Sequence, residues 1–304
     1  MSKREQAHDT LGNRLKAYEY LSTSRQLMPN TPVYARIDGR AFHTFCRGLE
    51  KPFSKAFIEV MQETCKFLVE ETNACLGYVQ SDEISLGWEN IVKAPFDGRV
   101  QKLESNLASL ASSKFVHCIE SFHSGSLHIN DDIDRLWHRL ETNLPSFDCR
   151  VFNVPTMTEL ANAFLWREND AIRNSILGMA YHMFSEQEVF KKNTDELVHM
   201  MRMKGYCFYE DTDPAFMRGT FYHRENYLKK LTDEEVSKIP ESQRCSNPNL
   251  VKGIDGSYSC WRSHIVPLFL PYRLTEIEDL EAVLFRGYFL SCKVENPTFD
   301  LKRN

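Results

Sequence analysis

The chain has 304 residues, of which 42% are hydrophobic and 26% charged, and its formal net charge is −5. This composition is typical of a globular protein with one large or two smaller domains, and the charge argues against a protein that coats nucleic acid indiscriminately. The apolar runs are too short to span a bilayer, and the N-terminus lacks the apolar segment of a secretory signal. We therefore expect a cytoplasmic, intracellular protein that does not enter membranes.

The nine cysteines are scattered, odd in number and never in C-x-x-C spacing. This pattern predicts reduced intracellular thiols and argues against a zinc site.

The first ninety residues alternate between helical and strand patterns. Ser54 is of the type that caps helices, and the apolar residues after it recur every three or four positions. The predicted elements are a helix at 9–22, a strand at 33–37, a helix from 54 to about 73, and strands at 76–80 and 84–88.

The rest of the chain predicts more helices than strands. Residues 121–146 are polar and predict a loop with a short helix around Trp137, and residues 231–263 predict a long flexible insertion. The other predicted elements are helices at 100–118, 158–166, 171–183 and 195–204, and strands at 147–155, 219–223 and 265–270. Because the helices are too few for strict alternation with strands, we expect an α+β fold with a mainly antiparallel sheet.

Two turns each place an acid where a predicted strand ends. Asp38 is followed by Gly39, and Asp82 lies between Ser81 and Glu83. Two carboxylates at one sheet edge form an oxygen-rich site that suits Mg²⁺. Gly39 has no Cβ, which would let the metal ion approach its carbonyl group closely. Ser81 and Glu83 flank Asp82 and could orient it or contact metal-bound water. Both sequences are also common in purely structural turns, and this alternative stays open.

Several cations are candidates for binding phosphate. Lys51 precedes Pro52 and the Ser54 helix, and Arg99 and Lys102 share one side of the next helix near its N-terminus. Such positions suit a polyphosphate, although a solvated helix face has the same pattern. The sequence also leaves open whether His43 binds a nucleotide or is an ordinary, partly buried histidine.

Two further regions combine polar and aromatic residues. Asp170 can cap the helix predicted at 171–183, in which Arg173 and Asn174 interrupt an apolar pattern. The region 190–230 is locally basic with interleaved aromatics, which is typical of RNA contact but also of a half-buried sheet edge.

The motifs together resemble those of a known family, the tRNA(His) guanylyltransferases and related 3′–5′ polymerases. They occur in family order over about residues 9–225. The matching segments are Arg36–His43, Lys51–Pro52, Gln80–Ser85, Arg99-x-x-Lys102, Phe147–Arg150, Trp166–Asp170, Asn174, Lys192–Asn193 and Gly219–Thr220. The resemblance implies a polymerase-palm or nucleotidyl-cyclase-like antiparallel sheet flanked by helices, with a C-terminal helical and strand extension. It also implies a palm-like catalytic domain at 1–135 and a second domain at 136–304 that completes the nucleotide and tRNA site.

By the same resemblance, Asp38 and Asp82 would be catalytic and, with the Gly39 carbonyl, would bind two Mg²⁺ ions. Residues expected to contact the nucleoside triphosphate are Arg36, Arg40, Phe42, His43, Lys51, Ser81, Glu83, Arg99 and Lys102. Residues expected at a second site for nucleotide or tRNA are Arg150, Arg167, Asp170, Asn174 and Lys192. The implied substrates are ATP, GTP or another NTP, and tRNA, and the implied assembly is a homotetramer.

One position departs from the eukaryotic pattern, because Ile172 stands where those enzymes carry a histidine. The chain resembles instead the "-like" members associated with template-dependent repair of tRNA 5′ ends. We therefore expect 5′-end repair, with non-templated addition of G to tRNA(His) as the alternative. A nucleotide cyclase and a non-catalytic RNA-binding module are further alternatives, although the hairpin Gln80–Ile84 lacks the Gly-Gly-Asp-Glu-Phe-like sequence expected of a cyclase.

Overall fold

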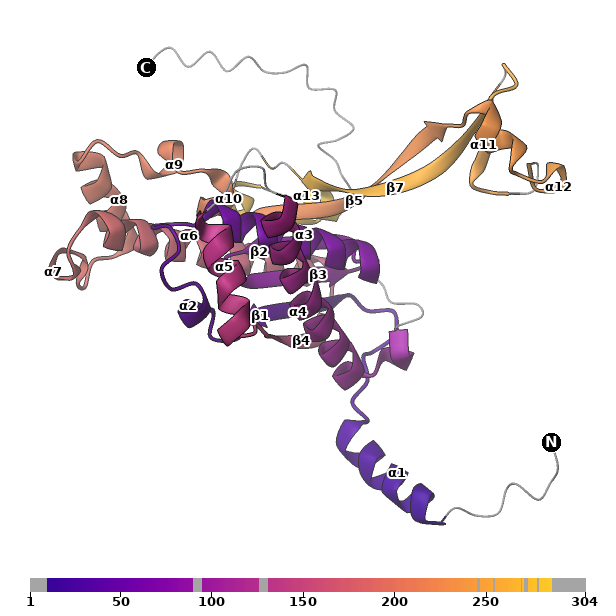
Figure 1. Cartoon of the computed structure of the whole chain (residues 1–304), viewed down its shortest axis with the longest axis horizontal. Coiled ribbons are helices and arrows are strands. Elements are labelled where there is room, and N and C mark those ends of the chain that lie inside the picture. The colour runs from indigo at the N-terminus through magenta and orange to yellow at the C-terminus, as the bar shows by residue number, and fades with distance from the viewer. Residues whose placement is uncertain are drawn as a thin grey trace.

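The computed structural model describes residues 10–89, 95–125, 131–244, 247–253, 255–268, 270, 273–277 and 279–285. Its centre is a seven-stranded sheet in the order β4-β1-β3-β2-β5-β7-β6, with every neighbouring pair antiparallel (Figure 1). The strands are β1 (Val33–Gly39), β2 (Leu76–Gln80), β3 (Glu83–Trp88), β4 (Phe147–Asn153), β5 (Thr220–Lys230), β6 (Leu250–Lys252) and β7 (Tyr258–Leu268). Helices pack on the sheet, so the expected α+β class is confirmed.

One face of the sheet is covered by α3 (Lys55–Thr72) and α4 (Val100–Gly125), and α5 (Asp131–Thr142) packs on these two helices. Because side chains alternate along a strand, Ala35 and Ile37 of β1 point into this core. Ser54 caps α3 by accepting a hydrogen bond from the Phe57 amide, as the sequence predicts.

The opposite face is covered by the first half of α6 (Met157–Met183) and by α13 (Leu280–Phe285). Tyr34 is fully buried there, and its hydroxyl lies 2.7 Å from the Ser85 hydroxyl. The second half of α6 packs against a smaller helical cluster. The helices of that cluster are α7 (Glu186–Val189), α8 (Thr194–Met203), α9 (Phe208–Asp211) and α10 (Pro214–Met217).

Two elements extend away from the body (Figure 1). Helix α1 (Thr10–Thr23) leaves its side chains largely exposed, and strands β5 and β7 continue beyond the sheet as a two-stranded ribbon. The ribbon carries α11 (Asp233–Ser237), α12 (Glu241–Arg244) and β6. The remaining short elements are α2 (Phe42–Phe45), η1 (Pro95–Gly98) and η2 (Leu274–Glu276).

The structure corrects the predictions for two polar segments. The polar segment 121–146 is not mainly a loop, because α4 continues to Gly125 and α5 occupies twelve residues, while 126–130 lie outside the described residues. The segment 231–263 contains two short helices, β6 and much of β7, which pairs residue by residue with β5. Its polar character reflects a ribbon exposed to solvent.

The two helices predicted at 158–166 and 171–183 form the single helix α6. Asp170 therefore lies inside a helix and does not cap one. The intervening polar residues do not break the helix because Arg167 and Arg173 both form ion pairs with Asp170.

The domain boundary at residue 135 stays a prediction. Strands β4 and β5, which follow it in the chain, pair with β1 and β2, which precede it. None of the described helices combines the length and apolar character needed to cross a membrane.

Candidate active site

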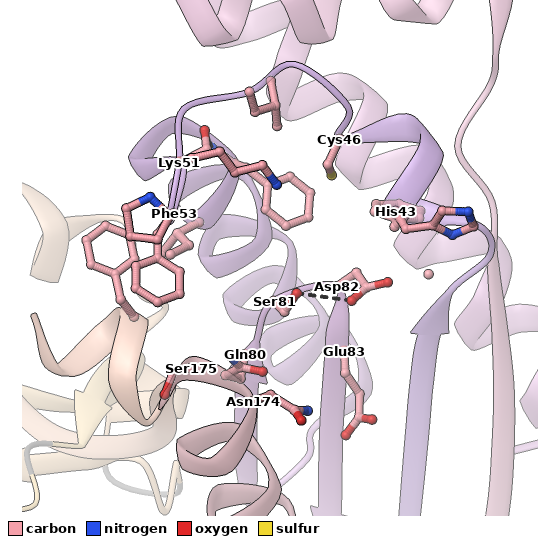
Figure 2. A pocket seen from close by; sticks show the side chains of 18 of the residues that line it. His43, Cys46, Lys51, Phe53, Gln80, Ser81, Asp82, Glu83, Asn174 and Ser175 are labelled. Atoms are coloured by element: carbon pink, nitrogen blue, oxygen red, sulfur yellow. Dashed lines mark hydrogen bonds between the residues drawn. The ribbon is translucent and has the colours of Figure 1, made fainter. Parts of the chain in front are cut away.

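The two acidic turns predicted from the sequence meet at one end of the sheet. Asp38 lies directly opposite Glu83 in the pairing of β1 with β3, so the next residue outward is Asp82. The Gly39 amide donates a hydrogen bond to the Asp82 carbonyl oxygen at 3.0 Å. The hairpin turn is tight, with Ser81 in the left-handed region (φ 52°) and its hydroxyl donating to Asp82 Oδ1 at 3.1 Å (Figure 2). The register of two antiparallel strand pairs therefore brings the two carboxylates together.

A pocket with a volume of about 580 Å³ opens beside these carboxylates (Figure 2). One side is formed by residues 41–54, called here the pocket wall, which connect β1 to α3. The other sides come from the hairpin at 80–83, from α6 and from α10. The predicted site residues that line the pocket are Asp38, Gly39, Phe42, His43, Lys51, Ser81, Asp82, Glu83, Arg167 and Asn174.

The charges at the carboxylate end favour a bound cation. Burial raises the pKa of the Asp82 carboxyl, and the neighbouring Asp38 carboxylate raises it further. The described residues hold no cluster of three or more His, Cys, Asp or Glu side chains able to enclose a metal ion. Two carboxylates with one nearby backbone carbonyl nevertheless fit Mg²⁺, which uses few protein ligands and takes others from water and substrate phosphates.

Gly39 is needed for packing as well as for access. A Cβ atom at this position would lie 2.5 Å from Cδ2 of Phe42. Phe42 is only 3% exposed and packs against Phe115 and Phe147. Phe42 is thus part of the floor of the pocket, fixed by the aromatic core beneath it.

Glu83, beside Asp82, is held by an arginine from α6. Arg167 donates from Nε to Glu83 Oε1 at 2.5 Å and from Nη2 to Oε2 at 2.8 Å. The same Nη2 donates to Asp170 at 3.1 Å, and Asn174 lies one helical turn further on, 3.5 Å from Asp170. These contacts join the acidic hairpin to the opposite side of the pocket through α6.

The remaining predicted residues do not line the pocket. Arg36 lies over the exposed ring of Trp166, with its Cζ 5.6 Å from the ring centroid. Arg36 Nε has no hydrogen-bond partner among the described residues. Those outside the pocket lining are Arg36, Arg40, Arg99, Lys102, Arg150, Asp170 and Lys192.

Arg99 and Lys102 lie at the opposite end of the sheet from Asp38. The start of α4 is bound to the segment before β1, since the Leu27 amide donates to the Gly98 carbonyl. The next residue, Met28, bonds to Asn153, which pairs with the first residue of β1, whereas Asp38 is near its last. Lys192, far from this region, pairs with Glu196 at 3.4 Å.

One end of the pocket is aromatic and was not predicted from the sequence. Phe53 and Phe216 are stacked with their ring centroids 5.1 Å apart and an interplanar angle of 12°. Both line the pocket, together with Ser54 and Ser175. Phe53 comes from the pocket wall and Phe216 from α10, so no local sequence pattern could have identified this pair.

An antiparallel sheet flanked by helices, with paired carboxylates, a pocket lysine and an aromatic end to its pocket, has the features of a nucleotidyltransferase, and the comparisons with known proteins agree. Residues 12–155 match the family model described as tRNAHis guanylyltransferase. The chain is 31% identical over 172 residues to the tRNA(His) guanylyltransferase of Schizosaccharomyces pombe, covering 56% of this chain and 59% of that protein. An uncharacterised protein of Acanthamoeba polyphaga mimivirus is 26% identical over 207 residues, covering 64% of this chain and 70% of its own length.

Solved structures with a similar fold also come from tRNA(His) guanylyltransferase-like proteins. A bacterial tRNA(His) guanylyltransferase-like protein in complex with ATP is 32% identical with a TM-score of 0.60, covering 71% of this chain and 87% of that one. A structure of such a bacterial protein with GTP is 26% identical with a TM-score of 0.62, covering 91% of this chain and 100% of that one. The chain belongs to the tRNA(His) guanylyltransferase family and is an enzyme of the nucleotidyltransferase class.

Proposed function

We propose that this chain is a Mg²⁺-dependent 3′–5′ nucleotidyltransferase that adds nucleotides to the 5′ end of tRNA, and that its main task is template-dependent repair of that end. The observation that carries the proposal is the convergence of Asp38 and Asp82 at one end of a pocket that also contains Lys51. Two carboxylates and a cation at one end suit the phosphates of a nucleotide, and the stacked phenylalanines at the other end suit its base.

The site residues divide into proposed tasks. Asp38, Asp82 and the Gly39 carbonyl would hold two Mg²⁺ ions, which would supply charge stabilisation for phosphoryl transfer. Lys51, with its side chain at the pocket wall, would bind triphosphate oxygens. His43 lies on the same wall, and Ser81 lies on the hairpin beside Asp82 (Figure 2). Phe53 and Phe216 would limit the position of the base and exclude water around it.

The proposed reaction has two steps. In the first step a 5′-phosphate oxygen of the tRNA forms a bond to the α-phosphorus of ATP and pyrophosphate leaves, so that the 5′ end carries AMP. A tRNA that already carries a 5′-triphosphate does not need this step. The 3′-hydroxyl oxygen of the incoming NTP then forms a bond to the 5′ phosphorus, and AMP or pyrophosphate leaves. This geometry requires the 5′ end and an NTP to meet near Asp38 and Asp82, with Arg167 and Asn174 closing the opposite side of the pocket.

The side chain at position 172 favours 5′-end repair over non-templated addition of G to tRNA(His). Ile172 is 8% exposed, belongs to the apolar cluster around α8 and does not line the pocket. The histidine of the eukaryotic pattern is thus replaced by a side chain that cannot exchange protons or hydrogen bonds with a substrate. The second candidate, addition of G to tRNA(His), is favoured by the family match and by the activity named for the fungal relative.

A homotetramer is also proposed, since the family resemblance implies one. The exposed apolar side chains of α1, among them Leu11, Leu15 and Leu21, support burial of this helix by another copy of the chain.

The test is incorporation of a labelled nucleotide into RNA. Purified protein is incubated with Mg²⁺, ATP and labelled NTPs, together with either a 5′-monophosphorylated tRNA lacking its first nucleotide or an intact tRNA(His). We expect faster, template-matched addition to the truncated tRNA. Preferential addition of G to intact tRNA(His) would establish the second candidate, a cyclic nucleotide product would show a cyclase, and binding without incorporation would show an RNA-binding module.

A further inference from the structure

The pocket wall at 41–54 carries His43 and Lys51 but contains little regular structure of its own. Within it, the helix α2 has four residues, and the following segment up to Ser54 is neither helix nor strand. A segment of this kind holds its shape only where other elements bind its backbone. In this chain helix α5 does so at both ends of the wall.

One contact point is Asp132, in the first turn of α5. This carboxylate is 4% exposed, and both of its oxygens accept from the Glu50 amide, at 3.2 and 3.0 Å. The Ser54 hydroxyl donates to Asp132 Oδ2 at 2.5 Å, while Ser54 also caps α3. Arg135 donates to Asp132 Oδ1 at 2.8 Å, which helps to offset the cost of burying the charge.

The second contact point is Arg139, two turns further along the same side of α5. Its guanidinium donates from Nη1 to the Thr44 carbonyl at 3.0 Å and from Nη2 to the Arg47 carbonyl at 2.9 Å. Between the two contact points, Ile133 and Leu136 are buried in the main core. Helix α5 is therefore fixed to the core and binds the wall on both sides of Cys46.

We propose that Asp132 and Arg139 are positioning residues, which hold the backbone of the pocket wall so that Lys51 and His43 face a bound nucleoside triphosphate. Asp132 and Arg139 act through the backbone of the wall and do not line the pocket. The inference rests on the proposed nucleotide site and adds α5, an element outside the pocket lining, to the residues that determine its affinity.

The first readout needs no nucleotide. Cys46 lines the pocket within the wall, whereas Cys65 is fully buried in α3, so the two thiols report on the wall and on the whole fold. The variants are Asp132→Asn, which replaces one accepting oxygen by a donor, and Arg139→Gln. The matched control is Asp131→Asn, because the Asp131 side chain is 81% exposed and lies next to Asp132 in the chain.

Alkylation by N-ethylmaleimide is followed by peptide mapping in each variant. We expect the rate at Cys46 to rise about 5-fold or more in both test variants, with Cys65 and the Asp131→Asn protein unchanged. If Cys46 and Cys65 react faster in parallel, or if Cys46 does not change, the proposal is overturned. Should Asp132→Asn fail to fold, Arg139→Gln carries the same test. Removing the Arg139 guanidinium breaks its hydrogen bonds to the wall, while the buried Asp132 carboxylate keeps its ion pair with Arg135.

The second readout links the wall to the phosphates. We expect Asp132→Asn to weaken ATP binding about 10-fold by calorimetry, which corresponds to the loss of one hydrogen bond to a charged group. In a Lys51→Ala background the same substitution should weaken binding less than about 2-fold, because its effect passes through the segment that carries Lys51. An undiminished effect in that background would mean that Asp132 changes ATP affinity by a route other than Lys51, and the proposal would be overturned. A wild-type chain that binds ATP but adds no nucleotide to tRNA would refute the proposed function and leave this inference standing.

Discussion

At the scale of single residues, the site combines a functional need with a cost in stability. Asp38 and Asp82 lie together at a partly buried turn, and burial and mutual repulsion raise the pKa of Asp82. Such a pair stabilises a bound cation but destabilises the free protein. The effect on metal binding and the effect on stability can be separated by a substitution that removes the charge of one carboxylate but keeps the shape of its side chain.

We predict that Asp82→Asn lowers Mg²⁺-dependent nucleotide incorporation by at least about 100-fold, which corresponds to about 3 kcal/mol of transition-state stabilisation. The melting temperature in metal-free buffer should stay the same or rise, because the repulsion with Asp38 is removed. Incorporation assays and thermal melts check the two parts. Activity within a few-fold of wild type would rule out the assigned metal ligand.

A second prediction concerns Gly39, whose missing Cβ leaves room for Phe42. Gly39→Ala should destabilise the protein by about 1–3 kcal/mol, measured by urea unfolding, since the ring of Phe42 is held by the aromatic core and cannot move freely. Combining it with Phe42→Leu should cost less than the sum of the two single changes. Simple additivity would show that the contact with Phe42 is not the cause.

At the scale of elements, α6 connects the sheet, the pocket and the C-terminal segment. Glu168 on α6 is fully buried, with Oε1 accepting from Arg218 Nε at 2.8 Å and Oε2 from the Leu274 amide at 2.7 Å. Arg218 also donates to the Leu270 carbonyl at 3.2 Å. These bonds fasten the segment after β7 to the helix that carries Arg167.

We predict that Glu168→Gln destabilises the chain by about 3–5 kcal/mol in chemical denaturation, because it leaves the Arg218 cation buried without its counter-charge. The double change Glu168→Gln with Arg218→Met should be less destabilising than Glu168→Gln alone. If the double variant instead has the lower free energy of unfolding, the destabilisation by Glu168→Gln comes from lost packing and not from the uncompensated charge of Arg218.

Strand β5 provides a pH-dependent contribution to stability through His223. Burial lowers the pKa of this imidazole below its ordinary value near 6.5. The stability it provides is present above the unfolded-state pKa and is lost as the pH falls toward the lower folded-state pKa, because protons then bind preferentially to the unfolded chain. His223→Asn should therefore reduce the loss of unfolding free energy between pH 7.5 and 5, as measured by urea titrations. An equally steep loss in the variant would assign it to other groups.

At the scale of the whole molecule, the body carries two projections with different surfaces. The exposed end of β5 in the ribbon combines lysines with Tyr227 and Leu228, whereas α1 exposes several large apolar side chains, with Leu15 and Leu21 53% and 78% accessible. An isolated helix of fourteen residues is marginal in water, so α1 is expected to gain its stability from contact with another surface.

If that surface belongs to a second copy of the chain, Leu15→Glu should shift the protein to a smaller assembly in light scattering. Its affinity for ATP should be unchanged, because α1 does not contribute to the pocket lining. An unchanged mass would show that α1 does not take part in assembly. A reduced affinity for ATP would show that α1 contributes to the nucleotide site.

Local patterns in the sequence were enough to predict the central part of the fold. The helical spacing after Ser54 and the two apolar strand segments beside Asp82 correctly predicted α3, β2 and β3. These signals are reliable because capping and side-chain periodicity depend on neighbours in the chain. The same local order placed Asp38 and Asp82 in turns, and the family resemblance gave them a role to test.

Only the tertiary structure decided which residues share the pocket. The antiparallel register brought Asp38 beside the Asp82 hairpin, and it left Arg99 and Lys102 at the far end of the sheet. The stacking of Phe53 on Phe216 joins segments far apart in the chain, and the contacts of α5 with the pocket wall likewise cross many residues. Such contacts arise from packing and strand pairing, whose partners a local pattern does not specify. The sequence by itself therefore determined the fold class and the two acidic turns, and the packing determined the pocket around them.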